Sequence, residues 1–345
     1  MAHLIRIFLI ASLLTMFSEQ SIAKTFKIAT LAPAGTAWMK EMKKGAGYIE
    51  EKTEGRVKLK FYPGGVMGNE QSVHRKIKVG QLHGGAFSSG GLAHLYPDIQ
   101  TLNLPMLFNS FDEVDYVRGK MDAALKQNME QNGFVLLGIA EGGFSRILSK
   151  KPMRDLASIR ASKLWVPEGD VMVQETYDTM GLSPIPLPVA DVFTGLQTGL
   201  VETVTITSSG AIAFQWHSST AYITDTPLIY LVGLLVVQKQ AFDKISPGDQ
   251  AIIKQEMAIV VEQMDKLTRE DNLKAIDALK KQGIIFVKPE QEELDRWKNL
   301  AARSIDNLIA KGALSQAGVD EVMKHLNDYR NSRLSSIKNS KMSAE

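Results

Sequence analysis

The feature that most constrains this chain is a long, unbroken helical pattern at residues 246–282. Ser246 can cap such a helix, Pro247 suits its first position and Asp249 places an acid at its third. Helical periodicity then continues without a breaking residue as far as Gln282, just before Gly283. At 1.5 Å per residue this helix is a rod of roughly 50 Å. That length exceeds the size of one small domain.

The rest of the chain alternates short β-type runs with helical runs, which is typical of parallel α/β architecture. The first set predicts strands near residues 26–31, 57–61, 83–87 and 134–139, and helices near 36–55, 69–79 and 112–132. The second set predicts strands near 144–148, 164–166 and 185–187, and helices from about 170 and 191. Two sets of strands and helices imply two hydrophobic cores. The apolar run 228–238 should return to the first sheet, and helices near 290–310 and 319–329 should follow.

Composition narrows the class of protein. The 345 residues are 44% hydrophobic and 23% charged, which is ordinary globular material for two domains. A net charge of +2 and the lack of a Lys/Arg block argue against a nucleic-acid partner. Cysteine is absent, which excludes disulfides, thiolate metal sites, cysteine nucleophiles and the lipidated cysteine of a lipoprotein.

The N-terminus has the pattern of a cleaved export signal. His3 and Arg6 give a weakly positive start, residues 4–17 are apolar, and Ser21-Ile22-Ala23 offers a small-x-small cleavage site. Polar residues follow too early for the roughly 20 apolar residues of a spanning helix, although a retained anchor is the alternative. We therefore expect residues 1–23 to be removed, leaving a soluble periplasmic protein without a membrane anchor.

Several short motifs follow one another in order along the chain. They include Gly55-Arg56-Val57-Lys58-Leu59, Leu104-Pro105-Met106-Leu107-Phe108, Lys151-Pro152-Met153 and Leu196-Gln197-Thr198-Gly199. In this order and with these gaps, they resemble the solute receptors of tripartite ATP-independent periplasmic (TRAP) transporters, including the C4-dicarboxylate receptors. The resemblance covers nearly the whole mature chain, about residues 26–334.

The resemblance implies a two-domain α/β clamshell, with crossing hinge strands and one long helix along both domains. Domain I would comprise residues 24–142 and 231–270, domain II residues 143–230 and 271–335, and a flexible tail residues 336–345. It also implies a monomeric receptor, not an enzyme, that captures a small solute in the interdomain cleft for delivery to TRAP permease subunits. No cofactor, metal or nucleic acid is expected.

The chain departs from the family at its ligand-gripping position. The family's K-x-R-V strand carries an arginine that holds a carboxylate with a two-donor fork, whereas here Lys163-Leu164-Trp165-Val166 places tryptophan there. An indole offers one N–H and a flat face but cannot neutralise an anion. We expect Trp165 to face the cleft and the solute to be an organic acid with an aromatic or aliphatic body. Burial of Trp165 in the core is the alternative.

Arg146 is the candidate for a compensating cation. The family's second arginine directly follows a Gly-Phe pair, but here Ser145 intervenes. Because successive strand residues face opposite ways, a cleft position and a surface ion pair are both open for Arg146. Other candidates come from loops near the cleft. Three have no alternative role: Trp38, Gln215 and Trp216. Capping or solvation is the alternative for Ser88, Ser89, Glu141, Glu168 and Asp170, a helix N-cap for Ser208 and Ser209, and a structural role for His217.

An exported enzyme is the rival class of function. The six histidines form no H-E-x-x-H motif, and the chain contains no G-x-S-x-G, P-loop or G-x-G-x-x-G motif. A periplasmic ligand sensor for a membrane kinase would use the same pocket as a transport receptor and differ only in its partner. The sequence therefore favours a binding protein over an enzyme.

Overall fold

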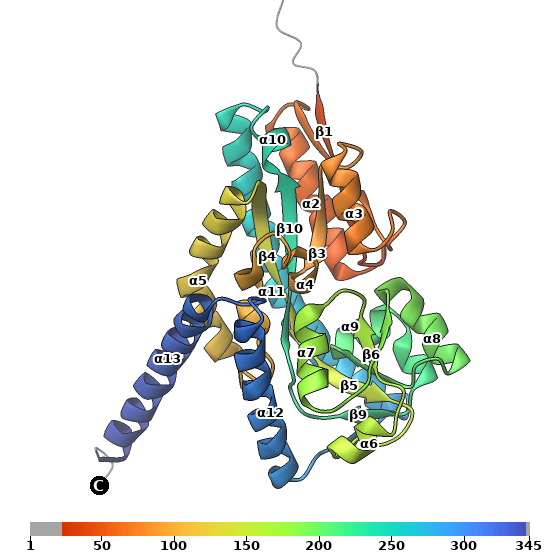
Figure 1. Cartoon of the computed structure of the whole chain (residues 1–345). Coiled ribbons are helices and arrows are strands. Elements are labelled where there is room, and N and C mark those ends of the chain that lie inside the picture. The colour runs from red at the N-terminus through yellow and green to blue at the C-terminus, as the bar shows by residue number, and fades with distance from the viewer. Residues whose placement is uncertain (1–22, 343–345) are drawn as a thin grey trace, which may run out of the picture.

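Two α/β domains lie one above the other along a long helix in the computed structural model, which describes residues 23–342 (Figure 1). The predicted export signal lies outside the described residues except for Ala23. Within the described part of the chain, no helix has both the length and the apolar character needed to cross a bilayer.

The first domain is built on a five-stranded sheet with the order β2-β1-β3-β10-β4. β1 (Lys24–Thr30) is parallel to β2 (Val57–Tyr62) and β3 (Gly84–Ser88). β10 (Tyr230–Gln238) runs antiparallel between β3 and β4 (Phe134–Phe144), so the predicted return of this apolar run to the first sheet is confirmed. The helical segments are α2 (Ala37–Lys52), α3 (Glu70–Lys78), α4 (Ser89–Leu92), η1 (Pro97–Asn103), α5 (Phe111–Gln131) and α10 (Lys239–Phe242).

Both faces of this sheet are buried, which explains the continuous apolar run in β4. Leu136 and Ile139 pack into a core shared with α3 and α5, whereas Val135 and Leu137 pack into a second core on the opposite face, shared with α2. A strand covered on both faces needs apolar residues at every position rather than at alternate ones.

The second domain contains a four-stranded sheet with the order β11-β9-β5-β8. These strands are β5 (Arg146–Ser149), β8 (Thr203–Ile206), β9 (Tyr222–Thr224) and β11 (Ile285–Val287). A parallel pair, β6 (Trp165–Pro167) and β7 (Ile185–Leu187), is joined to β8 by an isolated bridge between Leu164 and Thr203. The helical segments are α6 (Leu156–Arg160), α7 (Val171–Thr179), η2 (Val189–Asp191), α8 (Val192–Thr198), α9 (Ser208–Ala213) and η3 (Trp216–Ser219).

Two strand crossings connect the domains. β4 passes through Ser145 into β5, and β9 leads back to β10 through residues 225–229. The crossings bond to each other, because Ser145 N–H donates to Ile229 O at 2.8 Å and Leu228 N–H donates to Ser145 O at 3.0 Å. The expected crossing hinge strands are therefore confirmed.

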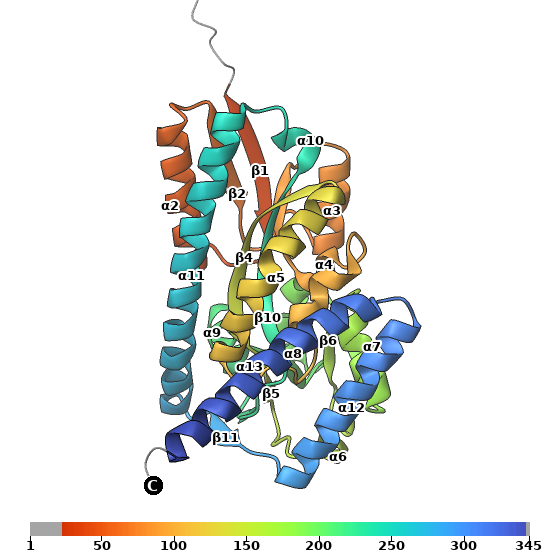
Figure 2. The same cartoon turned by 90° about the vertical axis from the view of Figure 1, so that its left-hand side faces the viewer.

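The long helix is α11 (Pro247–Lys281), with 35 residues. Ser246 caps it as predicted, since its Oγ accepts a hydrogen bond from Asp249 N–H at 3.1 Å. The helix packs on α2 and β4 in the first domain and on α9 in the second, and Figure 2 shows it running beside both. The predicted helix along both domains is confirmed.

Of the two C-terminal helices, only the last returns to the first domain. α12 (Gln291–Ala310) packs on α7, but α13 (Gln316–Met342) packs on α5. Arg330 of α13 donates from Nε to Glu113 Oε1 at 2.8 Å. The assignment of all of residues 271–335 to domain II is therefore wrong for α13. The tail predicted from residue 336 is also wrong in part, because α13 continues to Met342; residues 343–345 lie outside the described residues.

Candidate functional site

A cavity of about 730 Å³ lies between the domains, against the middle of α11. Thr30, Ser88 and Thr207 lie at or just beyond the ends of β1, β3 and β8, so the cavity sits where open α/β sheets usually bind ligands. Its volume suits a small organic molecule. Its polar and aromatic lining comprises Thr30, Thr36, Trp38, Glu70, Phe87, Ser88, Glu141, Thr207, Ser209, Phe214, Thr268, Asp271 and Lys274.

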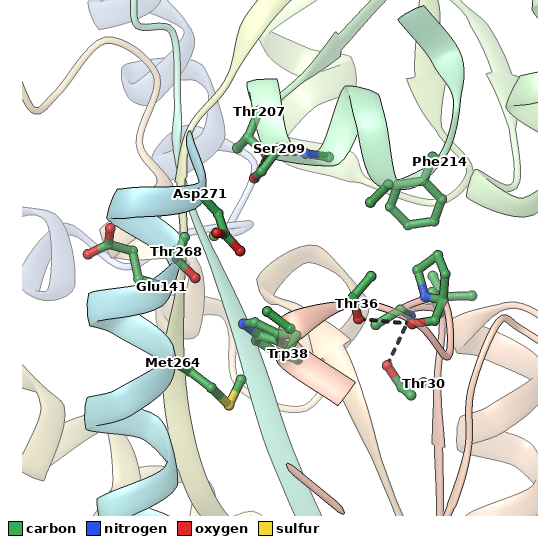
Figure 3. A pocket seen from close by; sticks show the side chains of 18 of the residues that line it. Thr30, Thr36, Trp38, Glu141, Thr207, Ser209, Phe214, Met264, Thr268 and Asp271 are labelled. Atoms are coloured by element: carbon green, nitrogen blue, oxygen red, sulfur yellow. Dashed lines mark hydrogen bonds between the residues drawn. The ribbon is translucent and has the colours of Figure 1, made fainter. Parts of the chain in front are cut away.

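One wall of the cavity is a face of α11. Met264, Thr268, Asp271 and Ala275 follow at intervals of four, three and four residues, which places them on one side of a helix. Figure 3 shows the side chains of Thr268 and Asp271 directed into the open space. Among residues 23–336, the Asp271 carboxylate has no hydrogen-bond or ion-pair partner, so it is free to meet a ligand.

Two aromatic side chains form the facing surfaces. Trp38 lies against β10, where an added Cβ at Gly233 would fall 2.5 Å from Cη2 of the indole. Glycine at position 233 is therefore what permits this close approach. In Figure 3 the indole nitrogen of Trp38 points toward α11, and Phe214 lies across the cavity in the second domain. These flat surfaces can hold an apolar or aromatic body.

Several hydroxyl groups of the lining already serve the fold. Thr36 caps α2, with its Oγ1 accepting from Met39 N–H at 3.3 Å, and Thr207 caps α9, accepting from Gly210 N–H at 3.1 Å. Ser209 Oγ donates to Asn272 Oδ1 at 3.0 Å, which ties α9 to α11. Ser209 keeps acceptor capacity toward the cavity.

Behind α11, the hinge holds a buried network of charges. Arg269 donates from Nη2 to Glu141 Oε2 at 2.8 Å, and the Tyr230 hydroxyl donates to the same oxygen at 3.3 Å. Burial raises the pKa of Glu141, against the opposing effect of Arg269. Arg118 Nη1 donates to Asp265 Oδ2 at 2.9 Å. Figure 3 shows the Glu141 carboxylate turned away from the cavity.

At another edge of the cleft, the two domains touch. Asn69 Nδ2 donates to Glu168 Oε2 at 2.8 Å. A Cβ at Gly90 would lie 2.7 Å from an oxygen of Asp170. Within the first domain, the Glu70 carboxylate packs even more closely on Gly91. Burial raises the pKa of Glu70 to about 7, with nearby Asp170 adding to the rise and hydrogen bonds from Ser88 opposing it. Burial also raises the pKa of Asp170.

The prediction that Trp165 faces the cleft is wrong. The side chain is 3% exposed and packs edge-on against Trp216, with ring centroids 5.3 Å apart. Its Nε1–H donates to Leu187 O at 3.0 Å. Because both its faces and its single donor are already used inside the second domain, Trp165 belongs to the core, which was the alternative reading.

Arg146 is also absent from the cavity lining. Its Nε lies 3.2 Å from Asp225 Oδ1, so the ion-pair alternative describes its position. Of the other predicted residues, the structure brings four to the cavity: Trp38, Ser88, Glu141 and Ser209. The remaining ones lie elsewhere: Ser89, Ser208 and Trp216 are buried, Asp170 caps α7, Glu168 bonds to Asn69, Gln215 is exposed, and His217 Nδ1 bonds to Ala211 O.

Sequence reasoning missed the α11 wall, although a signal for it exists. A helix that spans two domains must pass the cleft between them near its middle, and Thr268 and Asp271 lie in that central part. Phe214 and Thr207 were missed by one residue, since their neighbours Gln215 and Ser208 were chosen instead.

Comparisons with known proteins agree with this architecture. Residues 28–311 match the model of "Bacterial extracellular solute-binding protein, family 7". The 2,3-diketo-L-gulonate-binding periplasmic protein YiaO of Escherichia coli is 26% identical over 288 residues, covering 81% of this chain and 86% of that protein. The sialic acid-binding periplasmic protein SiaP of Vibrio cholerae is 20% identical over 88% of this chain and 96% of that protein.

Solved structures show the same fold. A TRAP periplasmic solute-binding protein of Haemophilus influenzae with bound L-gulonate gives a TM-score of 0.81 at 21% identity, covering 88% of this chain and 99% of that chain. The sugar acid binding protein DctPAm of Advenella mimigardefordensis, in complex with galactonate, gives 0.82 at 21% identity, covering 89% and 98%. The two-domain fold is therefore confirmed, and the chain belongs to bacterial extracellular solute-binding protein family 7, the solute receptors of TRAP transporters.

Proposed function

We propose that this receptor captures a small organic acid with an aromatic or aliphatic body and delivers it to TRAP permease subunits. The observation that carries the proposal is the interdomain cavity of about 730 Å³ with Trp38 and Phe214 on its facing sides. No arginine of the described residues contributes to its lining. The acid group would therefore meet neutral donors such as the Thr268 hydroxyl, or Lys274, rather than a guanidinium fork.

We also propose that the mature protein is a periplasmic monomer beginning at Lys24, where β1 starts. Closure would rotate residues 24–142 and 231–270 against residues 143–230 and 271–310, about the two crossings. Small-angle scattering at saturating ligand should then show a smaller radius of gyration. An unchanged radius would count against closure.

Native mass spectrometry of protein purified gently from the periplasm tests the binding function directly. We expect one small acid per monomer, and calorimetric titration of that acid should show affinity roughly 10-fold weaker or more for Trp38→Ala and Phe214→Ala. Tyr48→Ala, at an exposed aromatic outside this cavity, is the matched control. A protein that retains no solute and binds no organic acid would refute the proposal.

A further inference from the structure

We propose that the solute also carries a positively charged group, an ammonium or a substituted amine, which binds between the Asp271 carboxylate and the indole of Trp38. This inference rests on the proposed function, because it names the chemical class of the solute held in the same cavity. The solute would then be an amine-bearing acid with an apolar body.

The first argument is the charge of the lining, whose ionisable residues are Glu70, Glu141, Asp271 and Lys274. Three of them have partners: Glu141 bonds to Arg269, Glu70 Oε2 accepts from Ser88 Oγ at 2.8 Å, and Lys274 Nζ lies 3.3 Å from Glu270. In the part of the chain that the structure describes, Asp271 has none. Among the described residues, the cavity therefore presents Asp271 as an acid without a partner, while Glu70 bonds to a neutral hydroxyl and Lys274 is already paired with an acid.

The second argument is desolvation. Asp271 is half-buried, and a solute that fills the cavity removes water from its carboxylate. Burying an unpaired charge is costly unless an opposite charge or hydrogen-bond donors replace the water. A purely anionic solute would add repulsion to that cost, whereas an ammonium group offers up to three donors and the opposite charge.

The third argument is the position of Trp38. The lack of a side chain at Gly233 lets the indole pack closely against β10, so that its position is set by packing rather than by the ligand. In Figure 3, Trp38 and Asp271 border the same open space, with Thr268 between them along α11. A cation close to an indole and a carboxylate gains from both. Phe214, across the cavity, leaves room for the apolar body.

A matched set of three probes tests this inference on the mature protein by calorimetric titration: phenylethylamine, phenylalanine and 3-phenylpropionate. They share a phenyl body and differ in carrying an amine, both groups or a carboxylate alone. We expect phenylalanine to bind most tightly, and Asp271→Asn to weaken both amine probes by about 10- to 100-fold. The same substitution should leave 3-phenylpropionate unchanged or bound more tightly.

Asp277→Asn is the control, because Asp277 is an exposed acid on the same helix outside the cavity lining; it should change no affinity. Equal affinities of wild type and Asp271→Asn for both amine probes, or no binding of either at millimolar concentration, would overturn the inference. Binding of 3-phenylpropionate alone would overturn it too, while supporting the proposed function. Binding of phenylethylamine alone would support the cation site and count against an organic acid as solute.

Discussion

The charged side chains on the two sides of α11 differ in whether they have partners within the protein. Toward the hinge, Asp265 and Arg269 join a network in which each charge has partners, including Arg118, Glu141 and Asp115. Toward the cavity, Asp271 follows Arg269 by only two residues and has no partner among residues 23–336. Charged groups that stabilise the fold have hydrogen-bond and ion-pair partners within the protein, whereas a charged group without a partner in a cavity is available for a ligand.

Removal of Arg118 should have the largest effect on stability and tests whether the hinge charges support the fold. Its side chain is 10% exposed and pairs with Asp122 and Asp265, and Nη2 also donates to Ile139 O. Arg118→Met fills a similar volume but leaves these acceptors uncompensated, so we expect a loss of roughly 3–5 kcal/mol in the free energy of unfolding. Urea denaturation measures it.

A surface pair on α11 provides the control for Arg118. Lys266 Nζ lies 2.7 Å from Glu262 Oε1, and both side chains are more than half exposed. Glu262→Gln should cost less than about 0.5 kcal/mol. If Arg118→Met cost no more than this, the hinge network would not be a structural element.

The contrast between packed and open sites extends to two tryptophans. Trp165 is a core residue and Trp38 is a half-buried wall of the cavity. Truncation of a buried tryptophan costs about 3–5 kcal/mol, so Trp165→Ala should be less stable than Trp38→Ala by roughly 2–3 kcal/mol. Thermal and urea unfolding of the two variants checks this difference. Equal stabilities would mean that Trp165 is less tightly packed than the structure shows.

Helix caps and the orientation of Trp165 differ in how far the sequence could predict them. The caps at Ser246 and Thr36 were predictable, because the capping signal lies within a few residues of the helix it starts. The side to which Trp165 turns was not predictable, because it depends on Trp216, which lies 51 positions later in the chain. The position of Trp165 in the family motif indicated that its side chain faces the cleft. An indole has a large apolar surface, however, and burial of that surface in the core is favourable where no arginine is needed to hold a carboxylate.

The sequence indicates that the middle of α11 passes the cleft, but it does not indicate which face of the helix lines the cavity, for a related reason. Periodicity indicates that Thr268 and Asp271 share a face, but which face meets the cleft depends on how both domains pack on the helix. The return of α13 to α5 likewise depends on tertiary contacts, such as that of Arg330 with Glu113. Local signals specify elements, and only long-range packing orients them.

A smaller effect should appear at the domain contact, through the pH dependence of stability. The folded protein raises the pKa of Glu70 from 4.5 to about 7. Between these values the folded state holds a proton that the unfolded state has released, so stability should fall as pH rises through this window. Because Glu70 is half-buried, we expect a loss on the order of 1–2 kcal/mol between pH 4.5 and pH 7.5.

Glu70→Gln isolates this contribution, since the amide is similar in shape and does not titrate. We expect its stability to fall less with rising pH than that of the wild type, as measured by urea midpoints across the range. Glu51→Gln, at an exposed position on α2, should keep the wild-type profile. Identical profiles for all three proteins would assign the pH dependence to other groups.

The smallest expected effect is the change in stability on replacing Asp271. It tests most directly the difference between this unpaired carboxylate and the paired charges of the hinge. Since no partner is lost, Asp271→Asn should alter the free energy of unfolding by no more than about 0.5 kcal/mol, in either direction. Urea denaturation without ligand gives this value, with Arg118→Met measured in parallel. A loss above 1–2 kcal/mol would mean that Asp271 supports the fold through a contact of its own. A near-zero change means instead that the carboxylate stands at the cavity without helping to hold the protein together, which is expected of a residue whose partner arrives with the solute.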